Sequence, residues 1–315
     1  MYTYNTQQLA MVEDGHFATA KLDPNGTTAD WARSSGLDFR LKESVIQYET
    51  EMGLQQMRDA KVIYRGDTLR PIAHVGKGFK PVQPVDMISF YRKLCDLGNF
   101  QVEALGVLKG GAQMWGLAKT SFETRILGQD AVDAFLFFVT GNDSSMSTKV
   151  SFLSRRIACN NMINAAYGGN FGLGEWSIKV KHTSEVNFDG MYDQMTKLPQ
   201  YWETFTENAE NMALKKLNQE QMIEFFVSLY GDKAESQTQM VQKKVDQLIH
   251  LAYSSPGSEF RSARGTLWGA LNAVSYYTDH DCRARSAENR FSSAMTGAGN
   301  NLKKTAFSNA IELLG

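Results

Sequence analysis

The first half of the chain is patterned for short β-strands, because apolar and β-branched residues recur at alternate positions between turn signals. Two pairs of such runs, each pair joined by a glycine-containing turn, predict antiparallel hairpins. The paired runs are 61–65 with 71–75, and 100–108 with 112–122. The almost wholly apolar run 134–140 predicts a strand that is covered on both faces and central in the sheet. Further strands are predicted at 149–153 and 176–183.

Helical spacing of apolar residues appears first at 85–97, which predicts a helix with Asp86 in its first turn and Gly98 after its end. A second helix is predicted at 154–167, where Ser154 is read as the cap and a Gly-Gly pair follows. From residue 186 onward strand signals fade and helices are predicted. Their ranges are about 189–212, 218–230, 235–253, 259–278 and 300–314.

These elements predict an α+β fold: a mostly antiparallel sheet with a β-β-β-α core, followed by a helical C-terminal half. Residues 1–36 are polar and irregular, as in an arm that contacts a neighbouring subunit. The predicted division is an N-terminal arm or extension at 1–60, an α+β core at 61–185, and a helical region at 186–315 packed on the core.

Composition indicates the cellular compartment in which the protein is expected. The three cysteines, Cys95, Cys159 and Cys282, are widely spaced and odd in number, so no disulfide framework is suggested and a reducing cytoplasm is expected. The N-terminus has no basic region followed by an apolar run, and no stretch approaches the ~18 apolar residues of a membrane helix. We therefore expect neither secretion nor membrane insertion.

Charge is segregated along the chain although the net charge is −1. Segments 61–125, 149–182 and 261–304 hold 22 of the 33 Lys and Arg residues but 9 of the 34 Asp and Glu residues. If the fold brings these segments to one surface, they form a positive groove suited to a polyanion. The third segment is the least certain part of this groove, because its arginines fall in the helical half.

Several strings, in their order along the chain, resemble a phage- and plasmid-encoded family known as domain of unknown function 932. They are 70–76 (RPIAHVG), 79–84 (FKPVQP), 109–111 (KGG) with 115–119 (WGLAK), 156–161 (RIACNN), 178–183 (IKVKHT), and 265–268 (GTLW) with 271–274 (LNAV). The resemblance spans roughly 60–310 and implies no particular activity. The loop 141–148 departs from the family's usual Asn-Ser-His-Asp-Gly type string and lacks its histidine, which argues against a catalytic or metal role there.

A second resemblance is topological. The predicted order of hairpin, third strand and helix resembles the β-β-β-α core of single-strand annealing proteins of the Rad fifty-two type, which form rings and hold nucleic acid in an outer basic groove. Three strands and a helix recur in many folds, so this analogy concerns topology alone.

Candidate nucleic-acid-binding residues lie in the basic segments. Adjacent arginines at a predicted helix start present forked donors to phosphates, lysines two apart on a predicted strand follow a backbone, and an aromatic ring beside glycines offers a stacking surface. The residues are Lys77, Phe79, Lys80, Arg155, Arg156, Lys179 and Lys181. For each of them the alternative is structural: surface ion pairs, a solvated edge strand or a core aromatic.

Catalytic and metal-binding motifs are less well supported by the sequence than the candidate nucleic-acid-binding residues. The string Asp279-His280-Asp281-Cys282 has ligand atoms, but no partner pair at zinc-ligand spacing follows, so no metal or other cofactor is expected. Asp130 and Asp133 would hold Mg²⁺ in a nuclease, although such residues more often form a turn into a strand.

The sequence thus predicts a non-enzymatic protein that binds and anneals single-stranded DNA in phage or plasmid recombination. It would act in the cytoplasm as a homo-oligomer, in ring form if the topological analogy holds, and without a cofactor. RNA remains an alternative ligand. The alternative functions are a phage or plasmid protein-interaction module with no nucleic-acid activity and, third, a nucleic-acid hydrolase.

Overall fold

The computed structural model describes residues 22–164, 177–184, 186–231 and 239–315. The chain divides into two compact units, and neither unit is continuous in sequence. The first unit contains Met1–Ser121, Leu136–Ser151 and Ser177–Thr196, and the second contains Phe122–Phe135, Phe152–Trp176 and Lys197–Gly315. These units differ from the three predicted ranges, since strands near the middle of the chain contribute to both.

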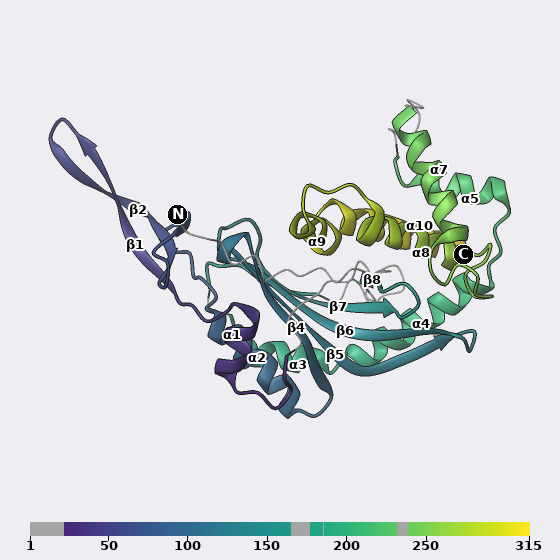
Figure 1. Ribbon diagram of the computed structural model, residues 1–315, viewed down its shortest axis with the longest axis horizontal. Helices are drawn as coiled ribbons and strands as arrows, with labels where there is room; N and C mark the ends of the chain where they lie inside the picture. The colour runs from purple at the N-terminus through teal and green to yellow at the C-terminus, as the bar shows by residue number, and fades with distance from the viewer. Residues whose placement is uncertain (1–21, 165–176, 185, 232–238) are drawn as a thin grey trace. The chain divides into compact units, whose positions relative to one another are not determined.

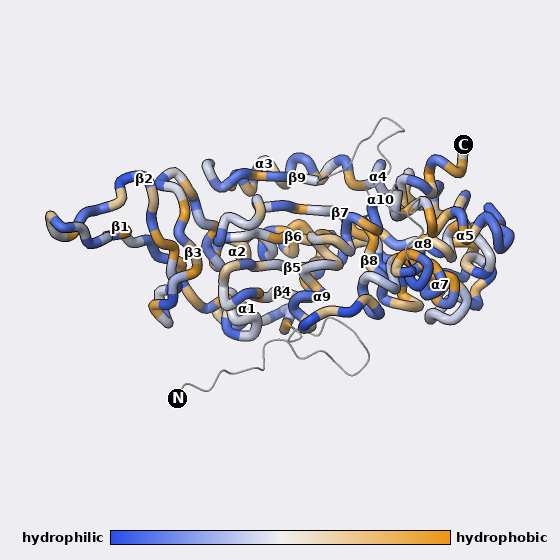
Figure 2. Tube along the Cα trace, turned by 90° about the horizontal axis from the view of Figure 1, so that it is seen from above, coloured by the Kyte–Doolittle hydropathy of each residue, from blue (hydrophilic) through white to orange (hydrophobic). Residues whose placement is uncertain are grey.

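The first unit begins with α1 (Thr28–Ser35) and a three-stranded sheet of described strands, in the order β1-β2-β3. These strands are β1 (Leu41–Thr50), β2 (Gly53–Arg65) and β3 (Pro71–Gly76), and both pairs are antiparallel. The predicted hairpin at 61–65 and 71–75 is therefore confirmed. Because β3 pairs only with residues 60–64 of β2, the distal part of β1 and β2 is a two-stranded ribbon (Figure 1). Hydrophobic and hydrophilic stretches alternate along it (Figure 2).

The described residues also form a six-stranded sheet, in the order β4-β5-β6-β7-β8, with β9 paired to β7 (Figure 1). Its strands are β4 (Phe100–Leu108), β5 (Gln113–Ile126), β6 (Asp130–Gly141), β7 (Thr148–Arg156), β8 (Asn161–Asn164) and β9 (Ser177–Val180). The predicted hairpin of β4 and β5 is confirmed as antiparallel. The apolar run predicted to be central is also confirmed: it is β6, the third strand along this path, and residues 134–140 are buried throughout.

In the first unit, α2 (Pro84–Asp96) packs its apolar face on the sheet, as its 3.6-residue spacing predicts. Tyr91 is fully buried there and its hydroxyl accepts a hydrogen bond from the Phe138 backbone N–H at 3.1 Å. Desolvation raises the pKa of Tyr91 well above its usual value, so the phenol stays neutral. Gly116 on β5 makes this approach feasible, since a Cβ at that position would lie 2.3 Å from the Tyr91 ring. In this unit α3 (Phe188–Met195) also contributes rings that meet Phe90.

The helix predicted at 154–167 is wrong over residues 154–164, and residues 165–167 lie outside the described residues. Ser154 to Arg156 finish β7, a turn covers 157–160, and β8 returns antiparallel with Arg156 opposite Asn161. The overlooked signal is the Asn-Asn pair: Asn160 adopts a left-handed conformation with φ of 52°, which asparagine tolerates better than most residues. In the described residues the strands at 100–140 are therefore followed by β7 and β8 and not by the predicted helix, and the likeness to Rad fifty-two type annealing proteins loses the helix on which it depended.

The helices of the second unit surround α8 (Leu267–Tyr276), in which every residue from Leu267 to Ser275 is buried. Described helices in contact with α8 are α4 (Leu198–Leu214), α5 (Gln219–Ser228), α7 (Gln239–Ser254) and α10 (Ala298–Leu314). A π-helical turn (Tyr277–Asp281) and α9 (Ala287–Thr296) complete this part. The helix predicted at 259–278 starts only at Leu267, because the Thr266 hydroxyl caps it by accepting from the Gly269 N–H at 3.0 Å.

The predicted fold class is confirmed: the protein is α+β, with antiparallel sheets in its N-terminal half and helices in its C-terminal half. Among the helices that the structure describes, none has both the length and the apolar character that a membrane span requires.

The close packing of α2 on β5 leads to a stability prediction. Substituting Gly116→Ala forces a methyl group into the Tyr91 ring and should destabilise the protein by about 1–3 kcal/mol. Urea unfolding followed by circular dichroism measures the change. Gly76→Ala is the control, because a Cβ there meets nothing within 4 Å, and an equal loss in both variants would contradict the packing argument.

Candidate nucleic-acid interface

The segment that follows β3 in the first unit carries Lys77, Phe79 and Lys80, and it is anchored through His182. The Lys80 N–H donates to the His182 carbonyl at 2.5 Å, and His182 Nδ1 lies 2.9 Å from the Lys80 carbonyl. A carbonyl only accepts, so these partners assign the hydrogen to Nδ1. His182 Nε2 is then left to accept from the Thr140 hydroxyl at 3.4 Å. Lys80 is thus fixed at its backbone while its side chain remains exposed.

Asn142, at the end of β6, anchors the same segment two residues further on. Its Oδ1 accepts from the Val82 N–H at 2.9 Å, and its Nδ2 donates to the Val82 carbonyl at 3.3 Å. Asn142 itself is fully buried, and its own N–H donates to the Ala112 carbonyl at 2.7 Å. The side chain therefore takes the place of a neighbouring strand for Val82, which satisfies two buried backbone groups.

These anchors frame a cavity of about 370 Å³ in the first unit. It is lined by Gly76, Gly78, Phe79, Ser144, Met146, Ser147, Lys181, His182 and Thr183. The Phe79 ring is half-buried and stacks on His182, with ring centroids 4.6 Å apart and planes at 11°. Two predicted binding residues, Phe79 and Lys181, therefore line one cavity.

Positive charge is exposed beside this cavity. Lys77, Lys80, Lys179 and Lys181 are all exposed, and all belong to the first unit. Strand β9 ends at Val180, so Lys181 lies just beyond it, while Lys179 on β9 is paired directly opposite Lys149 on β7. Four of the seven predicted residues are thus exposed lysines whose ammonium groups an anion can reach.

Lys77 also borders a second hollow, of about 500 Å³, where the β1–β2 register shifts. Arg58 and Lys61 are among its lining residues, and Lys61 forms an ion pair with Glu43 at 2.8 Å. The basic character of the first unit therefore continues from the cavity to the base of the ribbon.

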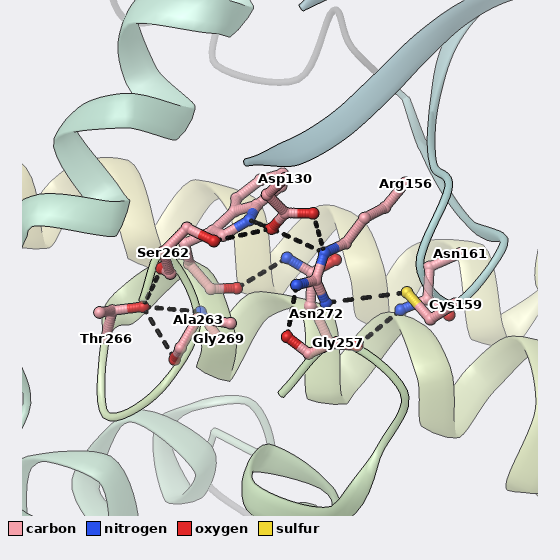
Figure 3. Close-up of polar contacts among 11 residues, drawn as sticks. Asp130, Arg156, Cys159, Asn161, Gly257, Ser262, Ala263, Thr266, Gly269 and Asn272 are labelled. Carbon is pink, nitrogen blue, oxygen red and sulfur yellow. Dashed lines mark hydrogen bonds and ion pairs between the residues drawn. The ribbon is translucent and has the colours of Figure 1, made fainter. Parts of the chain in front are cut away.

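Arg156 lies in the second unit and contradicts its predicted role. Its side chain is 2% exposed, and its Nε donates to both carboxylate oxygens of Asp130, at 2.7 and 2.9 Å (Figure 3). Another guanidinium nitrogen donates to the Gly257 carbonyl at 2.7 Å. Burial acts to lower the pKa of Arg156, but the hydrogen bonds and the charge of Asp130 outweigh it and the pKa is raised. Arg156 is therefore a buried structural cation and cannot contact a phosphate.

The Asp130 carboxylate is fully buried and has further donors (Figure 3). Its Oδ2 accepts from the Ser262 hydroxyl at 2.9 Å and from the Trp268 indole N–H at 3.0 Å. A carboxylate saturated in this way has no free lone pair directed at solvent, so it is unsuited to the Mg²⁺ role considered for a nuclease.

Arg155, on the other side of β7, is half-buried, and its guanidinium carbon lies 4.2 Å from the centroid of the Phe135 ring. The two arginines were predicted to start a helix and present parallel donors, but in a strand successive side chains point to opposite faces. Neither residue lies in the first unit with the exposed lysines.

The metal and catalytic candidates of the C-terminal half have structural partners. Asp279 forms a buried ion pair with Lys303 at 2.7 Å, and its other oxygen accepts from the Met162 N–H at 2.9 Å. Among the described residues no group of three or more His, Cys, Asp or Glu side chains is placed to hold a metal ion.

Sequence reasoning missed His182 and Asn142, which hold the cavity together. The bond between His182 and Lys80 joins residues 102 positions apart in the sequence, so no local pattern reveals it. The only available signal was that His182 belongs to one of the strings that carry the family resemblance.

The fold and the site define an α+β protein with exposed lysines around a partly aromatic cavity in one unit and buried ion pairs in the other. The chain matches the family described as Domain of unknown function (DUF932) over residues 71–295, and it belongs to that family. No curated protein and no solved structure matches it.

Removing the buried cation should destabilise the folded protein. Arg156→Met leaves the Asp130 charge buried without its partner and should lower the free energy of unfolding by about 3–5 kcal/mol. Urea unfolding measures this loss. The neighbouring Arg155→Met is the matched control and should cost clearly less, since the Arg155 side chain is half-buried and leaves no fully buried carboxylate behind when it is removed. Similar losses in the two variants would rule out a structural role specific to Arg156.

Proposed function

We propose that the protein binds single-stranded DNA through the first unit and anneals complementary strands, as a homo-oligomer in the cytoplasm, for phage or plasmid recombination. The observation that carries this proposal is the set of exposed lysines in the first unit, Lys77, Lys80, Lys179 and Lys181, of which Lys181 lines the Phe79 cavity. Family membership is compatible with it and adds no activity of its own.

Annealing requires no chemistry beyond binding. Lysine ammonium groups attract the phosphate backbone whatever the base sequence, and they release counterions from the strand. A strand held by its backbone keeps its base edges accessible, so a complementary strand can pair and replace weak protein contacts by duplex. A reaction of this kind uses no nucleotide, metal or catalytic residue, which agrees with the non-enzymatic function predicted from the sequence.

The proposed interface is smaller than the sequence predicted. Arg156 is withdrawn from it because the side chain is buried, and Arg155 is half-buried against a ring. What remains is a lysine surface, and lysine contacts phosphate as a flexible point charge without the paired geometry of arginine. Sequence-independent, strongly salt-dependent binding is therefore expected.

Titration of a labelled single strand at several salt concentrations tests the proposal. For single strands the slope of log affinity against log salt is about −0.7 per phosphate neutralised, so Lys179→Ala with Lys181→Ala should make the slope shallower by about 1.4. Fluorescence anisotropy provides the affinities. Annealing is measured separately, with complementary oligonucleotides and neither ATP nor metal.

A matched control removes the same charge elsewhere. Lys243→Ala with Lys244→Ala takes two lysines from α7 in the second unit and should leave the slope unchanged. If the wild-type protein fails to bind at low salt, the nucleic-acid function is excluded. If both double variants change the slope equally, binding is not localised to the proposed lysines.

One observation favours a second function, that of a protein-interaction module. The distal ribbon of β1 and β2 exposes large apolar side chains on one face, with Tyr48 at 49% and Met57 at 39% exposure. A two-stranded ribbon has little stability of its own, and exposed apolar surface of this kind usually marks an interface. Residues 45–58 carry Glu49 and Glu51 against a single cation, so this surface is unsuited to a polyanion.

The register of the ribbon favours a second copy of the chain as the occupant. Among the described strands β1 pairs only with β2, so its outer edge is unpaired. Two copies related by a twofold axis can pair β1 with β1 antiparallel, which places residues of the same face opposite each other. With Gln47 at the axis, Ile46 faces Tyr48 of the partner twice, and Met57 lies beside Ile46 on the same face. The result is a four-stranded sheet with one apolar face.

Sedimentation analysis tests this contact. Ile46→Asp with Tyr48→Asp should shift the protein from oligomer to monomer, because it buries two charges per copy at the paired edge. Gln47→Ser with Glu49→Gln, on the opposite face of the same strand, adds no charge at the paired edge and should leave the oligomer intact. A wild-type protein that sediments as a monomer at all concentrations tested would exclude pairing through this edge.

A further inference from the structure

The cavity of the first unit combines an aromatic floor with a polar rim. Phe79, Met146 and His182 supply apolar and ring surface, while Ser144, Ser147 and Thr183 bring hydroxyl groups. One face of the Phe79 ring is covered by His182, and the ring also lines the cavity. Because His182 is hydrogen-bonded to the Lys80 backbone, this floor is held in place before any ligand arrives.

Glycine forms part of the cavity lining. A Cβ placed on Gly76 or Gly78 would meet nothing within 4 Å, so the backbone here borders open space. The volume of about 370 Å³ is near the lower end of the roughly 300–1,000 Å³ that small-molecule sites occupy, and it suits one flat, nucleoside-sized group.

The positive charge at the cavity indicates that the ligand carries an anionic group next to its flat ring. Lys181 lines the cavity itself, whereas Lys80, on the segment bonded to His182, lines a separate hollow of about 360 Å³. A ligand that places a flat ring over Phe79 and an anion at the Lys181 ammonium group is a nucleobase with its adjoining phosphate. Paired bases stay stacked in a duplex, so only an unpaired base can enter.

We propose that this cavity takes one unstacked nucleobase of the bound strand, with Lys181 on the adjoining phosphate. The inference rests on the proposed single-strand binding and names the contact that distinguishes a single strand from a duplex. Every base has a flat face, so the cavity is expected to accept different bases. The strand is then held by its backbone along the lysines and by one base at Phe79.

Comparison of two oligonucleotides of equal length and charge isolates the contribution of the base to the binding affinity. One is a thymidine oligonucleotide, and the other is its abasic counterpart, which has the same phosphates and no bases. Wild-type protein should prefer the base-bearing strand by at least about fivefold, the lower end of the effect expected for one stacked base. Fluorescence anisotropy at fixed salt measures both affinities.

Two variants should abolish this preference and leave the salt slope unchanged. Phe79→Leu keeps apolar volume against His182 but removes the flat ring. Gly78→Leu fills the cavity from a position where its Cβ meets open space, so it is the second variant should Phe79→Leu perturb folding. Lys181→Ala should weaken both strands and make the slope shallower, because it removes a phosphate contact.

The possible outcomes distinguish failure of the base site from failure of the proposed single-strand binding. Equal wild-type affinity for the two strands overturns the base site and leaves single-strand binding standing. Loss of binding to both strands at low salt overturns the proposed function. In that case thymidine monophosphate is titrated while the Met146 methyl resonance is followed by NMR, and an unchanged resonance overturns the base site too.

Discussion

The buried ion pair between Asp130 and Arg156 is the interaction on which the second unit depends. It joins the start of β6 to the end of β7, and its remaining hydrogen bonds reach Gly257, Ser262 and Trp268 (Figure 3). A Cβ at Gly257 would lie 2.6 Å from Ala158, so the chain passes close to the pair without a side chain. Desolvating two charges is tolerable only when their lone pairs and protons are satisfied, and here sheet and helical segments supply the partners together.

This arrangement changes the meaning of the sequence strings shared with the family. The strings at 156–161 and 265–268 meet at the same carboxylate, and Gly116 in a third string admits Tyr91 to the sheet. These strings therefore include residues that close the fold. Others carry the proposed ligand contacts, because Phe79 and Lys80 lie in the string 79–84 and Lys179 and Lys181 lie in the string 178–183, while Lys77 falls between strings. Membership in the family thus reports on both the architecture and the proposed binding surface.

Local patterns predicted what depends on local physics. Hairpins with glycine turns, the apolar central strand and the amphipathic α2 all follow from neighbouring residues, and the structure contains each of them. The turn at Asn160 was missed because Ser154 offered a competing helix cap. The burial of Arg156 could not be predicted, since its partners lie 26 and 101 residues away and an arginine in a basic segment carries no mark of burial. The cavity could not be predicted for the same reason, because the hydrogen bonds of His182 and Asn142 join residues far apart in the sequence.

The interleaving of the two units has a practical consequence for dissecting the protein. Strands β5, β6 and β7 each begin in one unit and end in the other, so the backbone passes back and forth along single strands. No single cut, whether by protease or by gene truncation, yields either unit complete. Neither half can be expressed as a minimal fragment, and folding of the two is expected to be one cooperative event. Inserted labels or fusion partners belong at turns that do not carry the chain from one unit to the other.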